Sequence, residues 1–196
     1  MSPSLDPAGL DLLFREARTP HAFTDEPVTD DQIRAVYDLV KFAPTSLNQQ
    51  PLRMVLVRSP EARARLARYM YDENRDQLLG APLNALLLAD NEFHEQLPRL
   101  FPVFPQAKDL YYAERPAREE SAAFNAALQM GYLILAIRAV GLAAGPMTGF
   151  DFPGVAKEFA GPDHSVVAVM NIGRPARNAS SPRLPRLDYD EVVTTV

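Results

Sequence analysis

The sequence predicts one domain in which α-helices are combined with a few buried strands. Its 196 residues fit the usual size of a single domain, and 47% hydrophobic with 23% charged residues is a globular composition. Apolar residues recur at helical spacing in several segments, whereas short apolar runs bounded by proline, glycine or polar residues indicate strands. We therefore expect a single mixed domain over residues 1–196.

Two amphipathic helices are predicted near the N-terminus. The first ends at about Pro20, which breaks the helical pattern. Thr29 followed three residues later by Gln32 has the pattern of a capping box, so the second helix begins there. It stops before Pro44, because proline disfavours the helical conformation of the residue that precedes it. The apolar stripes comprise Leu10, Leu13, Phe14 and Ala17 in the first helix and Ile33, Val36, Tyr37 and Val40 in the second.

The middle of the chain alternates strands and helices. Apolar runs at 54–57 and 83–89 predict buried strands, separated by a charged helix at 59–71 and a short one from Asn74. Residues 93–117 mix prolines with aromatic side chains, which excludes one regular element but leaves much apolar surface. We expect this segment to be a folded, lid-like excursion.

The second half centres on a long buried helix. Residues 119–140 are apolar almost all round, and Gly141 follows them where a helix C-terminus favours glycine. The rest is predicted as a loop at 145–150, a short helix capped by Asp151, a strand at 165–172 and an extended C-terminal tail over 176–196.

Composition and motifs exclude several classes of function. A formal charge of -5 and scattered arginines argue against a nucleic-acid partner. The absence of cysteine excludes disulfides and thiolate metal sites, and the three histidines lack metal-ligand spacing. No uninterrupted apolar run approaches the roughly 20 residues needed to span a bilayer, and no signal peptide is evident. We expect a cytoplasmic protein without a metal site, and we find no hydrolase or nucleotide-binding fingerprint.

A turn after the first predicted helix carries a guanidinium, a hydroxyl and an imidazole. These belong to Arg18, Thr19 and His21. An arginine fork and a hydroxyl suit an anion or a carbonyl-rich ring. The plainer interpretation is a helix-ending turn with a solvated arginine.

The segment 44–51 concentrates hydrogen-bonding side chains in a loop with proline at both ends. Thr45, Ser46, Asn48 and Gln50 can address the donor and acceptor edge of a flat heterocycle without charge. The alternative is an ordinary polar loop between a helix and a strand.

Three weaker candidates follow along the chain. Asn74 and Gln77 lie one helical turn apart, so both can face one ligand, although such a pair is common. Arg183 lies in the tail, where it could reach a phosphate or simply be solvated. Glycines let the backbone approach a ligand closely in the run Pro146, Met147, Thr148 and Gly149, which can also be a plain turn.

In this order and spacing, these clusters resemble the nitroreductase family of flavoproteins over nearly the whole chain. The turn at 18–21 is similar to the basic, hydroxyl, basic turn of that family, and 44–51 is similar to its Pro-Ser-x-x-Asn-x-Gln-Pro motif, with Thr45 in place of serine. Within the family, segments such as 96–102, 145–151 and 183–187 resemble the malonic semialdehyde reductase group.

The resemblance implies an α+β fold in which a mostly antiparallel sheet is flanked by helices, in an intertwined homodimer that binds FMN between its subunits. Arg18 and Arg183 would then hold the phosphate, and Thr19 and His21 would lie near the ribityl chain or the pyrimidine edge. Asn74 would address the ring and 146–149 its reactive edge. The partner subunit would supply Thr45, Ser46, Asn48 and Gln50. Gln77 completes the set of cofactor-binding candidates.

The implied activity is transfer of hydride from NADH or NADPH through FMN to a small acceptor, with malonic semialdehyde as one candidate. Many relatives reduce nitroaromatics and quinones, so a general reductase is an alternative. A flavin-binding protein without turnover, or a helical scaffold without a cofactor, are the others. For an acidic acceptor, Arg99, Lys108 or Arg115 could supply a cation, and the simpler interpretation is that each is solvated.

Overall fold

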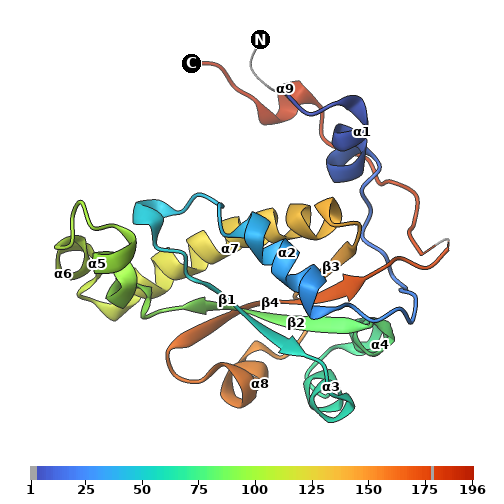
Figure 1. The fold of residues 1–196 in the computed structure, drawn as a ribbon, viewed down its shortest axis with the longest axis horizontal. Coiled ribbons are helices and arrows are strands. Elements are labelled where there is room, and N and C mark those ends of the chain that lie inside the picture. Colours follow the sequence, from blue (N-terminus) through green and yellow to red (C-terminus); the bar gives the residue numbers. More distant parts are fainter. Residues whose placement is uncertain (1–3, 178) are drawn as a thin grey trace.

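The computed structural model describes residues 4–177 and 179–196, and its centre is a four-stranded sheet (Figure 1). The strand order is β1-β2-β4-β3, and every neighbouring pair is antiparallel. This confirms the α+β fold class with an antiparallel sheet between helices. The strands are β1 (Leu52–Val57), β2 (Leu83–Asp90), β3 (Ala143–Met147) and β4 (His164–Gly173).

Helices cover both faces of the sheet (Figure 1). On one face lie α2 (Asp30–Val40) and α7 (Arg115–Ala139), which contribute Val36 and Leu133 to the core cluster there. The opposite face is covered by α3 (Pro60–Ala67), α4 (Asp72–Gly80), α8 (Phe152–Val155) and a π-helical turn at Ala156–Ala160. β2 is buried almost throughout because it is central and covered on both faces.

The predicted start of α2 and end of α7 are confirmed by their capping groups. Thr29 Oγ1 accepts from the Gln32 backbone at 3.2 Å, and Gln32 Oε1 accepts from the Thr29 backbone at 2.9 Å. Gly141 has φ +80, the left-handed conformation that ends a helix. α7 starts at Arg115 and not at 119. Pro116 is tolerated there because the N–H groups in the first turn of a helix have no partner within the helix.

By length and apolar composition, α7 is the one described helix that could cross a membrane. It packs against α2 and the sheet, as a core helix does (Figure 1). Only 39% of its most apolar window is buried within this chain, so part of its apolar surface is left open.

The predicted loop at 145–150 is wrong in its first half, where β3 pairs with β4 in register Gly145↔Asn171. Glycine and proline suggest a turn locally, but β3 is an edge strand, where a missing N–H is tolerated. A Cβ at Gly145 would make only ordinary van der Waals contact, 3.5 Å from the Asn171 Cβ, so the position does not require a turn-forming glycine. Tertiary pairing thus overrides the local turn signal.

Several other helices and strands begin or end at different residues from those predicted. α3 ends at Ala67 although the predicted helix extended to 71, α4 begins at Asp72, and β1 begins at Leu52. The predicted short helix capped by Asp151 is confirmed as α8, whose Gly154 N–H donates to Asp151 at 3.1 Å.

The excursion is folded, as predicted, around aromatic side chains. It contains a 3₁₀ turn (Phe93–Gln96), α5 (Leu97–Leu100) and α6 (Ala107–Tyr112). Phe93 and Tyr112 make an edge-to-face contact with ring centroids 4.9 Å apart, and both pack against α7.

The two ends of the chain project together from the body (Figure 1). The N-terminal part contains α1 (Pro7–Leu10) and a π-helical turn (Asp11–Arg15). The tail was predicted to be extended throughout, which is wrong at α9 (Tyr189–Val192), where Asp188 and Glu191 form a capping box.

Candidate functional site

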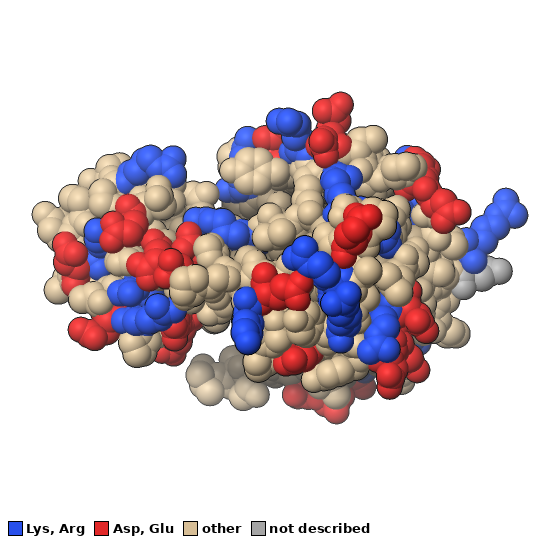
Figure 2. All heavy atoms as spheres, turned by 90° about the horizontal axis from the view of Figure 1, so that it is seen from below, with Lys and Arg blue, Asp and Glu red and all other residues tan. Residues whose placement is uncertain are grey.

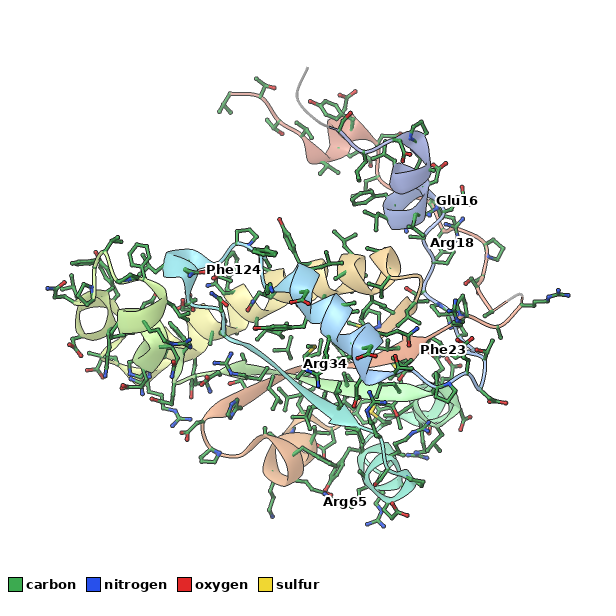
Figure 3. All side chains as sticks on the ribbon, viewed as in Figure 1. Glu16, Arg18, Phe23, Arg34, Arg65 and Phe124 are labelled. Atoms are coloured by element: carbon green, nitrogen blue, oxygen red, sulfur yellow. The ribbon has the colours of Figure 1, made fainter. Side chains whose placement is uncertain are left out.

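A hollow of about 560 Å³ at the base of the N-terminal arm collects four arginines. Arg18 lies where this arm meets the body (Figure 3). We call this feature the arginine hollow; its polar lining comes from the turn after the first helix, the last turn of α7 and the tail. These polar side chains are Arg18, Thr19, His21, Arg138, Arg183 and Arg186, with Ser181 beside them. The structure therefore brings together the predicted residues of the turn and the tail.

Three of these guanidinium groups converge on the end of the π-helical turn that follows α1. Arg18, Arg138 and Arg183 donate to backbone carbonyl oxygens within residues 13–17, at 3.1 to 3.4 Å. Arg183 also donates to the Arg15 carbonyl oxygen. Carbonyls at a helix C-terminus lack partners within the helix and carry a partial negative charge, so they attract cations.

The arginine hollow is strongly cationic because no acid lines it. Among residues 4–177 and 179–196, its four arginines form no ion pair with a carboxylate. Burial lowers the pKa of Arg138, and the positive charge of Arg183 lowers it further. Forked donors that face one space without an acid are suited to phosphate.

Backbone and side-chain contacts join the tail to the turn. The His21 N–H donates to the Ala179 carbonyl at 2.8 Å, and His21 Nε2 lies 3.5 Å from Ser181 Oγ. These contacts place the tail along the same side of the hollow as Thr19, which is exposed.

A second hollow, of about 320 Å³, continues from the first toward the sheet. Both are lined by Ala17, Arg18 and Arg138, and the second also reaches Leu142 and Ala143 where β3 begins. An elongated ligand with an anionic end could therefore extend from the arginines toward β3.

α4 contacts the segment 146–149, which includes the end of β3 and which we call the glycine run. Asn74 Nδ2 donates to the Gly149 carbonyl at 3.0 Å, and the Tyr71 N–H donates to the same oxygen at 3.1 Å. Pro146 and Thr148 are exposed, whereas Met147 is buried with Asn171 Nδ2 3.7 Å from its sulfur. Gln77 is half-buried on α4, one turn beyond Asn74.

The loop at 44–51 is held in an unusual conformation. Leu47, Asn48 and Gln50 have φ values of 49, 52 and 45, in the left-handed region that disfavours residues other than glycine. Such residues cost roughly 1–3 kcal/mol each and are typical of functional loops.

Buried amide contacts hold this loop on α7. The Ser46 N–H donates to Asn125 Oδ1 at 2.9 Å, and the buried Gln49 donates to Ser121 Oγ at 3.0 Å. Within the loop, the Gln50 N–H donates to Thr45 Oγ1 at 3.2 Å. The structure therefore fixes this loop before any ligand binds.

Asn48 and Gln50 lie at the tip of the loop. Asn48 Nδ2 donates to the Leu100 carbonyl of the excursion at 2.9 Å, and Gln50 Nε2 donates to Asn48 Oδ1 at 2.9 Å. These contacts couple the loop to α5.

The loop and the arginine hollow are placed at separate points along α7. The loop contacts Asn125 and the hollow contains Arg138, thirteen residues further along the helix. At 1.5 Å per residue this is a separation of about 20 Å. The structure does not bring Thr45, Ser46, Asn48 and Gln50 to Arg18 within one chain.

The sequence did not single out Arg138 as a site residue, and it indicated Gln49 only as one of the polar side chains of the loop. Arg138 is a lone cation at the end of an apolar helix, a pattern that also fits a simple interaction with the helix dipole. Gln49 is completely buried, although it lies among polar neighbours in a loop. Both roles depend on tertiary contacts.

Among the described residues, neither a second strongly charged surface on the face of α3 and α8 (Figure 2) nor a metal-binding group is found. On the face covered by α3 and α8, basic and acidic side chains are interspersed, so neither charge dominates (Figure 2). Within the part of the chain that the structure describes, no three His, Asp or Glu side chains are placed to hold a metal ion.

The chain belongs to the nitroreductase family, whose model matches residues 14–174. A Streptomyces coelicolor protein, provisionally named an NADH dehydrogenase/NAD(P)H nitroreductase, is 63% identical over 196 residues, with 100% of both chains covered.

Solved structures share the fold at lower sequence identity. A provisionally assigned nitroreductase from Bacillus subtilis has a TM-score of 0.88 at 22% identity, over 97% of this chain and 100% of that one. A second, from Exiguobacterium sibiricum in complex with FMN, has a TM-score of 0.82 at 19% identity, over 100% of this chain and 99% of that one. These likenesses support the fold.

The contact between α4 and the glycine run can be tested by mutation. A Cβ at residue 149 would overlap Asn74 Nδ2, so Gly149→Ala must displace Asn74. We expect it to lower the free energy of unfolding by about 1 kcal/mol, because the displaced Asn74 amide loses its hydrogen bond to the Gly149 carbonyl. In an Asn74→Ala background the same change should cost clearly less, measured by urea denaturation. Equal costs in both backgrounds would contradict this contact.

Proposed function

We propose that this chain is an FMN-dependent NAD(P)H oxidoreductase whose cofactor sites are completed between two copies. The observation that carries this proposal is the arginine hollow, which gathers cations without an acid and continues toward β3. Membership of the nitroreductase family and the names of the relatives support the same activity.

The residues of the hollow fit the phosphate of FMN. Arg18 and Arg183 would hold it, while Thr19 and His21 would lie beside the ribityl chain or the pyrimidine edge. Asn74 and Gln77 would face the ring from α4. The backbone of 146–149 would face its reactive edge; β3 supplies a rigid surface there because it pairs with β4. Burial, and then the charge of Arg183, lower the pKa of Arg138, and a bound phosphate would offset the second of these causes.

Thr45, Ser46, Asn48 and Gln50 of the partner subunit would complete the site. The separation of about 20 Å along α7 supports this, since their own chain holds them far from the arginine hollow. The strained loop is already anchored to α7, so it can present these groups to another chain without ordering first.

An open apolar face supports pairing of two chains. α2 and α7 pack together, and both leave large side chains exposed. Phe42 is 77% exposed and Phe124 is 68% exposed, and Phe124 projects from α7 in Figure 3. Exposed apolar surface of this kind is typical of an interaction site, and a two-fold dimer buries the same surface on both chains. Tyr37 and Leu39 of α2 and Tyr132 of α7 are exposed as well.

When bound, FMN accepts hydride from NADH or NADPH and delivers it to the acceptor. The protein binds and orients the reactants and excludes water from them. No acid and base pair is needed for this role, and the excursion at 93–117 would act as a lid over the acceptor.

The acceptor is a small oxidant, with malonic semialdehyde as the specific candidate and nitroaromatics and quinones as alternatives. The three suggested cations of the excursion have local partners. Lys108 lies 2.5 Å from Glu95, Arg115 lies 2.7 Å from Glu119, and Arg99 donates to Gln96 at 3.1 Å. These pairs favour the general reductase over an acid-specific one.

Purified protein should be yellow and should bind FMN. It should oxidise NADH or NADPH when an acceptor is present, with parallel lines in double-reciprocal plots, because donor and acceptor use one slot in turn. Initial rates with malonic semialdehyde, a quinone and a nitroaromatic would identify the acceptor. FMN binding without oxidation of NADH or NADPH would indicate a flavin-binding protein that is not an enzyme. Absence of FMN binding would refute the proposal.

Shared sites predict complementation between two variants. Arg18→Glu repels the phosphate, and Ser46→Trp places a bulky ring on an exposed loop position, so each variant alone should lose FMN. In a randomly mixed population of dimers, half are mixed and each mixed dimer has one unaltered site, so roughly one quarter of the sites should return. Bound FMN and turnover measure this recovery. Mixed dimers that recover no FMN would show that both residues serve one chain's own site.

A further inference from the structure

We infer that Arg138 is a third cationic ligand of the FMN phosphate and gives the site its preference for FMN over riboflavin. This inference rests on the proposed function and assigns a role to a residue that the sequence pattern did not select. Arg138 lies in the last turn of α7, on the wall that the two hollows share.

The guanidinium of Arg138 is placed in the hollow with most of its donors unused. An arginine has five N–H donors, yet within residues 4–177 and 179–196 the only hydrogen bond of this side chain joins Nη1 to the Leu13 carbonyl at 3.3 Å. Its Nε is buried without a partner among those residues. Arg138 as a whole is half-buried, but this nitrogen is buried, and buried donors are usually satisfied, so the free Nε–H indicates a missing acceptor.

The charges around Arg138 identify that acceptor as an anion. Arg18, Arg183, Arg186 and His21 line the same hollow. Glu16 lines only the neighbouring hollow, and within the described chain it forms no ion pair with these arginines. Burial and Arg183 lower the pKa of Arg138, which shows that its charge is poorly compensated. A phosphate dianion would supply the compensation.

The other three arginines of the hollow are more heavily engaged, and Arg186 donates to the Leu184 and Pro185 carbonyl oxygens of its own segment. Arg183 donates to three carbonyl oxygens and Arg18 to two, which ties both to the end of the first helix. Arg138 has one such contact, and α7 is anchored in the core. Arg138 is thus the arginine that a rigid element holds in the hollow.

FMN and riboflavin separate this role from a structural one, because they share the ring and differ only in the phosphate. We expect Arg138→Met to weaken FMN binding about tenfold or more, as loss of one charge-assisted contact does, and to leave riboflavin binding unchanged. Dissociation constants of the apoprotein for both flavins, from quenching of flavin fluorescence, measure the ratio. The plot of log Kd for FMN against log salt should also become less steep.

Arg34→Met is the matched control. Arg34 is exposed on α2, away from the hollow, and should leave both dissociation constants unchanged (Figure 3). Arg138→Lys keeps the charge but loses the planar fork, so it should give an intermediate preference for FMN. It carries the test if Arg138→Met does not fold.

Equal weakening of both flavins by the Arg138 variants, or no change in either, would overturn the inference. Wild-type protein that binds neither flavin would overturn the proposed function together with it. Wild-type protein that prefers FMN, with that preference kept in the Arg138 variants, would overturn the role of Arg138 alone.

Discussion

The length of α7 determines how this protein can build a cofactor site. The helix contacts the loop at 44–51 through Asn125 and contributes Arg138 to the arginine hollow, about 20 Å further along its axis. Both points are anchored in the core, which holds the loop and the hollow apart within one chain. In the proposed site the two groups come from different chains, and the open apolar face of α2 and α7 is suited to that pairing.

The arginine hollow and the loop at 44–51 differ in charge. The arginines of the hollow can bind an anionic group tightly, but they do not distinguish one ring from another. The loop offers amides and hydroxyls, which can read the edge of a heterocycle but add no charge. The tail and the first helix are joined by Arg183 and by the His21 contact to Ala179, so an anion bound in the hollow would also fix this projecting arm.

Local signals predicted the parts of this structure that depend on neighbouring residues. The capping box at Thr29 and the terminal glycine Gly141 are examples, since their contacts lie within a few residues. β3 was missed because its pairing with β4 is made across the fold. The family resemblance implied that Arg18 and Arg183 lie together, whereas Arg138 entered the site only through packing of α7.

Cross-linking can test the shared site directly, because the chain contains no cysteine. Ser46 in the loop and Ser181 in the hollow are both exposed, so cysteines placed there should be accessible. The double variant would be treated with a bis-maleimide too short to join the two positions within one chain, then run on a denaturing gel. Sharing between subunits predicts a covalent dimer. A cross-linked monomer would show that the loop and the hollow of one chain meet, and would contradict it.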